Sequence, residues 1–356
     1  MNGQRRALFI LIFFVPLLFS SCAEKKRQVT RSYYFWRSNG ITGSERKFLK
    51  ENQVKKLYVR LMDVDWNEVY GPVPVAKGYP GEVNQEVNYY DSLQMQIVPV
   101  VFITNKTFQR IDSSDVPLLA KRVVQKFLSS YKQRSWGISF QPSEIQIDCD
   151  WTESTRSRYF YFLQQVKWLL ASPDVLISAT IRLHQYKYPG KTGVPPVDRG
   201  MLMVYNLSDL RAYSSVNSIY DNDQAKKYFN SGKKYSLPLD IVLPAYSWCI
   251  IFRDQQFYQI ENGLSEKDLN ELSFLEKRKN GFYGVKQDTV FHDLFLRPGD
   301  EIKPETIDSQ TLQEAARLAQ KAVNADSFAV AFFELSDKEI INYDHETLEN
   351  IYRSYY

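Results

Sequence analysis

Residues Glu144 to Glu153 read Glu-Ile-Gln-Ile-Asp-Cys-Asp-Trp-Thr-Glu, a short alternating strand that ends in carboxylates. Successive side chains of a strand point to opposite faces. The polar face of this strand comprises Gln146, Asp148 and Asp150, and the apolar face comprises Ile145, Ile147 and Cys149. This pattern indicates that the apolar face is covered and the acidic face borders a polar space. Neighbouring carboxylates repel each other, which raises the pKa of one of them, so the segment predicts a site at the end of a strand.

Strand-like and helix-like segments alternate outward from this stretch. The expected strands are Tyr33 to Arg37, Lys56 to Asp63, Gln96 to Ile103, Glu144 to Asp150, Val175 to Leu183, Gly200 to Tyr205, Leu239 to Tyr246 and Ser327 to Phe333. The expected helices are Ser44 to Asn52, Gln85 to Leu93, Val116 to Gln133, Thr155 to Leu170, Asp221 to Phe229 and Ser309 to Asn324. Eight strands alternating with helices predict an α/β fold, a (β/α)8 TIM barrel with its active site at the C-terminal ends of the strands. The alternative is an open doubly wound sheet, but no glycine-rich phosphate turn follows the first strand.

One segment exceeds what a minimal barrel needs. Residues 249–308 contain a strand-like Phe252 to Ile260, a helix-like Ser265 to Lys279 and an extended Gly281 to Leu296. We expect an insertion after strand seven that forms a wall over the barrel mouth. In the alternative interpretation, part of this run is a barrel strand and the strand count shifts by one. Residues 33–356 otherwise read as a single barrel without a dividing linker.

The N-terminus has the pattern of an export signal. Arg5 and Arg6 precede an apolar run from Ala7 to Phe19, which is shorter than the roughly 20 residues of a membrane span. The small residues before Cys22 resemble the lipobox of bacterial lipoproteins. Residues 1–21 are thus expected to be a lipoprotein signal peptide, with lipidation at Cys22 and residues 22–32 as a tether. The protein would then be exported and lipid-anchored to the cell envelope, at the outer membrane or periplasmic face. An ordinary cleaved signal with an incidental cysteine is the alternative.

Charge and cysteine content exclude several other classes. The net charge is +4, and removal of Arg5 and Arg6 leaves +2, so no nucleic-acid partner is expected. The remaining cysteines, Cys149 and Cys249, fall on the fourth and seventh strands, farther apart than the roughly 7 Å that a disulfide spans. His184 has no second histidine or cysteine at metal-ligand spacing. We therefore expect neither a metal nor a cofactor.

Tryptophans gather at the predicted strand ends. Trp36, Trp66, Trp151 and Trp248 fall at or after the ends of strands one, two, four and seven. Indole faces stack on apolar C–H faces of sugars while polar edges stay available for hydrogen bonds, so a carbohydrate ligand is expected. In the alternative interpretation these residues close the barrel top by packing.

Polar residues at the same ends complete the expected substrate-binding set: Asp63, Asp65, Arg182, His184, Tyr205, Asn206 and Glu334. Arg182 and His184 share the inward face of strand five. A buried arginine needs an acid, which Asp148, Asp150 or Asp63 would supply. The alternative is a purely structural ion-pair network.

These motifs resemble the chitinase-type glycosidase barrels. The resemblance rests on Asp148-Cys-Asp150-Trp-Thr-Glu153 at strand four and Met203-Val-Tyr205-Asn206 at strand six. In that family strand four ends Asp-x-x-Asp-x-Asp-x-Glu, with the glutamate as proton donor, and the strand-six tyrosine supports the substrate's acetamido group. In this chain the donor position falls on Thr152, and Glu153 comes one residue late. The whole also resembles bacterial exported lipoproteins that carry glycosidase-like barrels.

Two functions follow as expectations. The first is a glycoside hydrolase-like envelope lipoprotein that uses Asp148, Asp150 and Glu153 for carboxylate acid/base chemistry on a polysaccharide or glycan. The second is a non-catalytic glycan-binding or scaffold lipoprotein that keeps the barrel and its aromatic mouth without the donor.

Overall fold

The computed structural model describes residues 27–38, 40–76, 95–133, 142–214, 216–229 and 234–356. The expected helix Gln85 to Leu93 and the signal segment with Cys22 lie outside these residues. None of the described helices combines the length and apolarity that crossing a bilayer requires.

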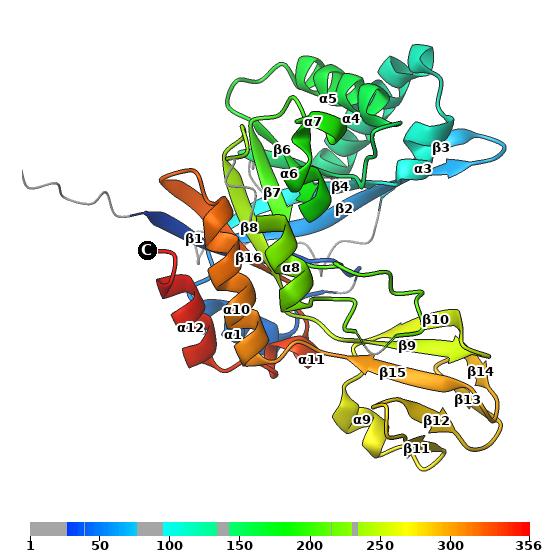
Figure 1. Cartoon of the computed structure of the whole chain (residues 1–356). Helices are drawn as coiled ribbons and strands as arrows, with labels where there is room; N and C mark the ends of the chain where they lie inside the picture. The colour runs from blue at the N-terminus through cyan, green and yellow to red at the C-terminus, as the bar shows by residue number, and fades with distance from the viewer. Residues whose placement is uncertain (1–26, 39, 77–94, 134–141, 215, 230–233) are drawn as a thin grey trace, which may run out of the picture.

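Eight parallel strands form a closed barrel (Figure 1), so the (β/α)8 prediction is confirmed and the open sheet is excluded. They are β1 (Gln28–Phe35), β2 (Lys56–Asn67), β4 (Gln96–Ile103), β5 (Glu144–Asp148), β6 (Leu176–Arg182), β7 (Arg199–Met203), β8 (Leu239–Pro244) and β16 (Ser327–Phe333). The ring closes because β1 pairs with β16 on one edge and with β2 on the other. The bounds of β4 and β16 are those that the sequence predicts.

Helices surround the strands (Figure 1). They are α1 (Gly43–Glu51), α3 (Asn105–Arg110), α4 (Val116–Gln133), α5 (Arg156–Leu170), α6 (Leu183–Lys187), α7 (Pro189–Thr192), α8 (Asn222–Phe229), α10 (Ser309–Ala319), α11 (Asp337–Ile340) and α12 (His345–Arg353), with single 3-10 turns at Ser113–Asp115 and Gln320–Ala322. Sequence analysis missed α12, whose first turn is capped by the Asp344 side chain and whose buried face includes Leu348 and Ile351.

The second strand is longer than predicted. β2 continues beyond Asp63 to Asn67 and turns back into β3 (Gly71–Ala76), which pairs with it in antiparallel fashion. This hairpin projects from the barrel (Figure 1). As a result, Asp65 and Trp66 lie on the hairpin and not at the barrel mouth.

The insertion follows β8, the seventh barrel strand, as expected. Its main sheet has the order β10 (Gln256–Asn262), β9 (Trp248–Arg253), β15 (Glu301–Glu305), β12 (Tyr283–Val285) and β11 (Leu275–Lys277), beside the hairpin β13 (Thr289–Phe291) and β14 (Leu294–Leu296). The strand expected from Phe252 to Ile260 is two strands, because Asp254 and Gln255 form a turn with positive φ. The expected helix Ser265 to Lys279 shortens to α9 (Glu266–Asn270), since β11 pairs with β12 instead.

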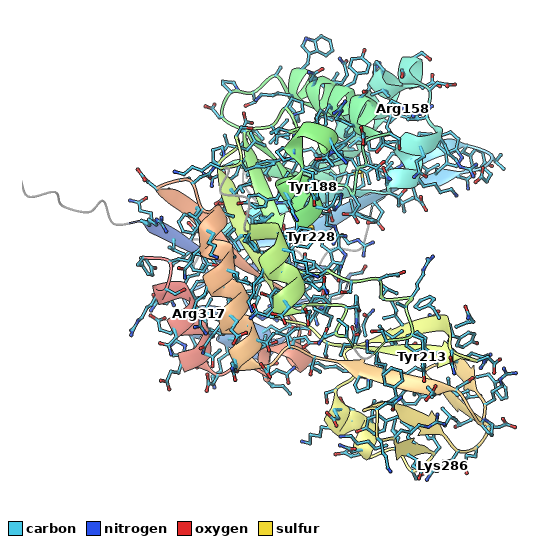
Figure 2. All side chains as sticks on the ribbon, viewed as in Figure 1. Arg158, Tyr188, Tyr213, Tyr228, Lys286 and Arg317 are labelled. Atoms are coloured by element: carbon cyan, nitrogen blue, oxygen red, sulfur yellow. The ribbon has the colours of Figure 1, made fainter. Side chains whose placement is uncertain are left out.

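Aromatic packing ties the insertion to the barrel. Tyr213, in the loop after β7, meets Phe252 and Phe282 edge-on with ring centroids 5.3 Å away in both cases. Its hydroxyl donates to Glu301 at 2.6 Å. Figure 2 shows Tyr213 at the side of the insertion. Both cysteines of the described residues are free and buried, Cys149 in the barrel core and Cys249 in the separate core of the insertion.

Charged residues fill the end of the barrel opposite the strand C-termini. Lys56 Nζ lies 2.8 Å from Glu144 Oε2, and both side chains are almost fully buried. Beside them Arg199 donates to Asp240 at 2.6 Å. Such pairs persist because either partner left alone would be an uncompensated buried charge.

The substitution Lys56→Met tests this pairing. We expect it to lower the free energy of unfolding by about 3–5 kcal/mol, because Glu144 loses its cation. The double substitution Lys56→Met with Glu144→Leu should recover most of that loss. Urea unfolding of the full chain measures both, and a single substitution without cost would contradict the assignment.

Candidate functional site

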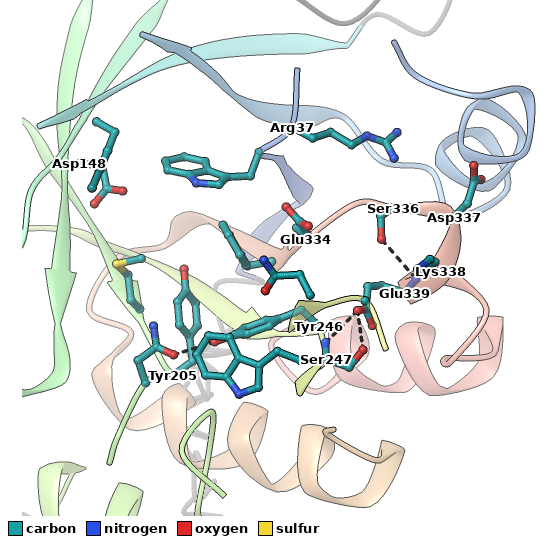
Figure 3. Close-up of a pocket in the computed structure, with 18 of the residues that line it drawn as sticks. Arg37, Asp148, Tyr205, Tyr246, Ser247, Glu334, Ser336, Asp337, Lys338 and Glu339 are labelled. Atoms are coloured by element: carbon teal, nitrogen blue, oxygen red, sulfur yellow. Dashed lines mark hydrogen bonds between the residues drawn. The ribbon is translucent and has the colours of Figure 1, made fainter. Parts of the chain in front are cut away.

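A cavity of about 710 Å³ opens at the C-terminal ends of the barrel strands. Its lining comprises Trp36, Arg37, Phe102, Asp148, Asp150, Arg182, Met203, Tyr205, Asn206, Tyr246, Ser247, Trp248, Asn262, Gly263, Phe333, Glu334 and residues 336–339. In Figure 3 Glu334 lies between Asp148 on one side and the segment 336–339 on the other. The insertion contributes Trp248, Asn262 and Gly263, so it forms part of the cavity wall.

Asp148 sits at the end of β5 and is 6% exposed. Its Oδ1 accepts a hydrogen bond from Thr180 at 2.6 Å. Burial, followed by the charge of Asp150, raises the pKa of Asp148 to about 6. Alternation along the strand thus places this carboxyl on the cavity side, and desolvation makes it a proton acceptor near neutral pH.

Asp150 carries the ion pair expected for Arg182. Arg182 Nε and Nη2 donate to the two carboxylate oxygens of Asp150, with Nη2 2.5 Å from Oδ2. A bidentate fork of this kind fixes both groups. Asp150 is therefore held in place at the cavity edge, while Asp148 takes its hydrogen bond from a neutral hydroxyl.

Glu334 follows β16 and precedes α11. Desolvation, followed by the charge of Glu339, raises the pKa of Glu334 to about 7. Within the described residues no hydrogen bond or ion pair holds its carboxyl group. A carboxyl that is partly removed from water without a partner costs stability, and such groups cluster at functional sites.

The two tryptophans of the cavity have polar anchors behind them. The Arg60 guanidinium lies 5.1 Å from the ring of Trp36 and is itself held by Asp63 at 2.7 and 2.6 Å. Trp248 Nε1 donates to Glu305 at 2.7 Å. Both indoles are thus fixed as they border the cavity, and Asp63 holds the Arg60 guanidinium that lies beside Trp36.

The motif that follows β7, the sixth barrel strand, supplies polar groups to the cavity as predicted. Tyr205 is 3% exposed, and its hydroxyl has no hydrogen-bond partner among the described residues. Asn206 has a positive φ, and its Oδ1 accepts from the Tyr246 hydroxyl at 2.7 Å. Tyr205 therefore lines the cavity, and its hydroxyl is buried there without a partner.

Residues 151–153, directly after Asp150, lie outside the cavity. Trp151 is fully buried and stacks on Tyr159, with ring centroids 5.2 Å apart, so it packs beneath α5. Thr152 and Glu153 are exposed in the turn before α5, where the Thr152 amide donates to the Thr155 hydroxyl. The chain leaves the barrel at this point, so neither the family's donor position nor Glu153 reaches the cavity lining.

Three more predicted residues lie elsewhere. Asp65 accepts from Thr104 at 2.6 Å on the β2–β3 hairpin, and Trp66 follows it there. His184 lies on α6 outside the cavity lining, and desolvation, followed by the charge of Arg182, lowers its pKa. The helix begins at Leu183, so the inward alternation expected of His184 has already ended.

Sequence analysis missed the segment after β16. Ser336, Asp337, Lys338 and Glu339 all line the cavity. Ser336 caps α11 by accepting from the Glu339 amide, a spacing that the capping pattern of a serine followed three residues later by a glutamate could have indicated. Tyr246 and Ser247 were missed as well, since they follow the seventh strand without a charged residue.

Within the described residues no group of histidine, cysteine and acidic side chains is arranged to hold a metal ion.

The fold is that of solved glycosidase barrels. No protein-family model and no curated protein sequence matches the chain. A chitinase from Chromobacterium violaceum superposes with a TM-score of 0.54 at 10% identity, covering 91% of this chain and 98% of its own. The spore cortex-lytic enzyme SleL from Bacillus cereus gives 0.50 at 13% identity, covering 93% and 75%. A mutant chitinase from Cycas revoluta in complex with (GlcNAc)4 gives 0.52 at 9% identity, covering 92% and 99%. At these identities the similarity establishes the barrel architecture.

The substitution Glu334→Gln tests the burial of this acid. A carboxyl whose pKa is raised on folding destabilises the folded state at high pH, and the penalty disappears as the pH falls. We expect Glu334→Gln to be more stable than the wild type at pH 8 by about 1–3 kcal/mol, since one pKa unit corresponds to about 1.4 kcal/mol. Urea unfolding at pH 8 and pH 5 measures this, and a difference that is the same at both pH values would overturn it.

Proposed function

We propose that the protein is a glycoside hydrolase in which Glu334 is the proton donor and Asp148 the base. The observation that carries this proposal is that two carboxyl groups without an ion-pair partner among the described residues border one cavity, which two anchored tryptophans also line. The cavity lies where (β/α)8 barrels place their active sites.

The environments of the two acids assign their roles. Between pH 6 and pH 7 Glu334 retains its proton more than Asp148 does, because its pKa is raised further, to about 7 against about 6. Glu334 donates this proton to the glycosidic oxygen as the bond to the anomeric carbon breaks. Asp148 accepts a proton from the water that attacks that carbon. Pairs of acids with pKa values separated in this way divide the roles of acid and base.

The cavity also suits the ligand class. Trp36 and Trp248 offer faces for sugar rings, and the Tyr205 hydroxyl beneath the cavity lining has no other partner among the described residues. The (GlcNAc)4 found with the Cycas revoluta chitinase makes glycans that contain N-acetylglucosamine the first class to test.

Activity measurements test the assignment. We expect Glu334→Gln and Asp148→Asn each to lower kcat roughly a hundredfold or more, the usual contribution of a positioned acid or base. The pH profile of kcat/KM should be bell-shaped, because Asp148 becomes protonated below about pH 6 and Glu334 ionises above about pH 7. Labelled N-acetylglucosamine oligosaccharides and peptidoglycan fragments serve as substrates.

Glu153→Gln is the matched control, because Glu153 is exposed outside the cavity. Its activity should equal that of the wild type. If Glu153→Gln is inactive while Glu334→Gln is active, the donor is wrongly assigned.

A non-catalytic glycan-binding role is the second candidate. It is favoured by Thr152, which replaces the glutamate at the family's donor position, and by the Arg182 fork that occupies Asp150. If the wild type binds these oligosaccharides without cleaving any of them, this second function replaces the first.

We further propose that the protein is exported and anchored to the cell envelope by a lipid on Cys22. The support is the order of two arginines, an apolar run and small residues before this cysteine. In a bacterial host, Cys22→Ala should move the protein from the membrane fraction to the soluble fraction and abolish incorporation of labelled palmitate. Absence of label in the wild-type protein would instead support an ordinary cleaved signal.

A further inference from the structure

We propose that a second cavity beside the first binds additional sugar units of the same glycan, so that the ligand is a polymer of neutral or amino sugars. This inference rests on the proposed function. The second cavity has a volume of about 550 Å³ and is lined by α9, α11 and the segments 306–308 and 341–343. Each cavity alone falls within the range of a small-molecule pocket, and the pair offers room for a longer ligand.

The two cavities have one wall in common. Tyr246, Ser247, Gly263, Lys338 and Glu339 line both. At the base of this wall Glu339 Oε1 accepts hydrogen bonds from the amide and the hydroxyl of Ser247, each at 2.8 Å. Ser247 and Glu339 are both buried, so this part of the wall is fixed.

The exposed part of the common wall includes the side chain of Lys338. Lys338 crosses beside Gly263, where a Cβ atom would lie 3.0 Å from Lys338 Cδ. Gly263 has a φ of +67°, so its conformation and its lack of a side chain both suit this crossing. Within the described residues Lys338 has no ion pair or hydrogen bond. An exposed cation therefore lies where a chain would pass from one cavity to the other, with its donors available to sugar hydroxyls.

The lining of the second cavity suits sugar rings. Ile341 is 80% exposed there and offers an apolar surface. Tyr343 lies beneath it, and its hydroxyl donates to the Ile307 carbonyl at 2.7 Å. A pyranose ring has an apolar C–H face and polar hydroxyl edges, so it matches a cavity that combines an apolar surface with oxygen atoms.

The charge of the second cavity narrows the ligand class. Its acidic residues are Glu266, Asp268, Glu271, Asp308 and Glu339, against Lys267 and Lys338. An excess of carboxylates repels a polymer of uronic acids. Neutral or amine-bearing sugars are therefore the favoured occupants.

Binding as a function of chain length tests the inference. In full-length Glu334→Gln protein, the labelled hexasaccharide of N-acetylglucosamine should bind about tenfold more tightly than the disaccharide, which corresponds to about 1.4 kcal/mol. Ile341→Ser combined with Glu271→Ala should remove most of this advantage and leave disaccharide binding unchanged. A hexasaccharide of galacturonic acid should bind more weakly than the neutral one. Fluorescence anisotropy measures all three.

Glu276→Ala is the matched control, since Glu276 is exposed on β11 and lines neither cavity. Thermal unfolding confirms that every variant is folded. Equal affinity for the two neutral lengths, or a hexasaccharide affinity unchanged in the double variant, overturns this inference and leaves the proposed function standing. If the galacturonic acid chain binds as tightly as the neutral chain, the ligand class is wrong. If neither neutral sugar binds, the proposed function fails together with this inference.

Discussion

The alternation of side chains along a strand is the constraint on which the site depends. In β5 it directs Gln146 and Asp148 toward the barrel interior, while Ile145 and Ile147 pack outward. The closed ring of parallel strands then fixes what these side chains meet, since each strand has neighbours on both edges. A shift of one residue in the pairing of β5 would exchange the two faces. The same register therefore places Asp148 in the cavity and the isoleucines in the core.

The electrostatics of the cavity separate two kinds of carboxylate. Asp150 and Glu339 have donors that hold them, whereas Asp148 has a single neutral donor and Glu334 has none among the described residues. Arg182 fixes Asp150 in an ion pair and Ser247 holds Glu339 by two hydrogen bonds, so these two acids fix parts of the cavity wall. Asp148 and Glu334, which have no ion-pair partner among the described residues, have pKa values raised to about 6 and about 7, and this lowers folding stability at high pH. In the proposed reaction, the acids that transfer protons are therefore the ones that lower the stability of the fold.

Sequence reasoning could place the strands because period-two hydrophobicity is a local property. It therefore located Asp148, Arg182 and Tyr205, which sit on or directly after strands. It failed where the chain leaves regular structure. Trp151 turns under a helix and Trp66 follows its strand into a hairpin, and both changes depend on pairing partners far along the chain. Glu334 could be predicted from its place directly after β16, the eighth barrel strand. That its carboxyl has no partner among the described residues depends on the tertiary structure. The second cavity has no signal in sequence, since four separate segments meet there: residues 246–247, 263–271, 306–308 and 338–343.

The same alternation recurs in β9, with a different result. Trp248, Ile250 and Phe252 pack with the barrel core, and Cys249 and Ile251 belong to the core of the insertion. One strand thus joins two cores, and the second of them supports the loop that carries Asn262 and Gly263. Separate cores open with separate free energies. The temperature at which the cavity loses its wall is consequently set by the small core of the insertion, and the barrel can remain folded beyond it.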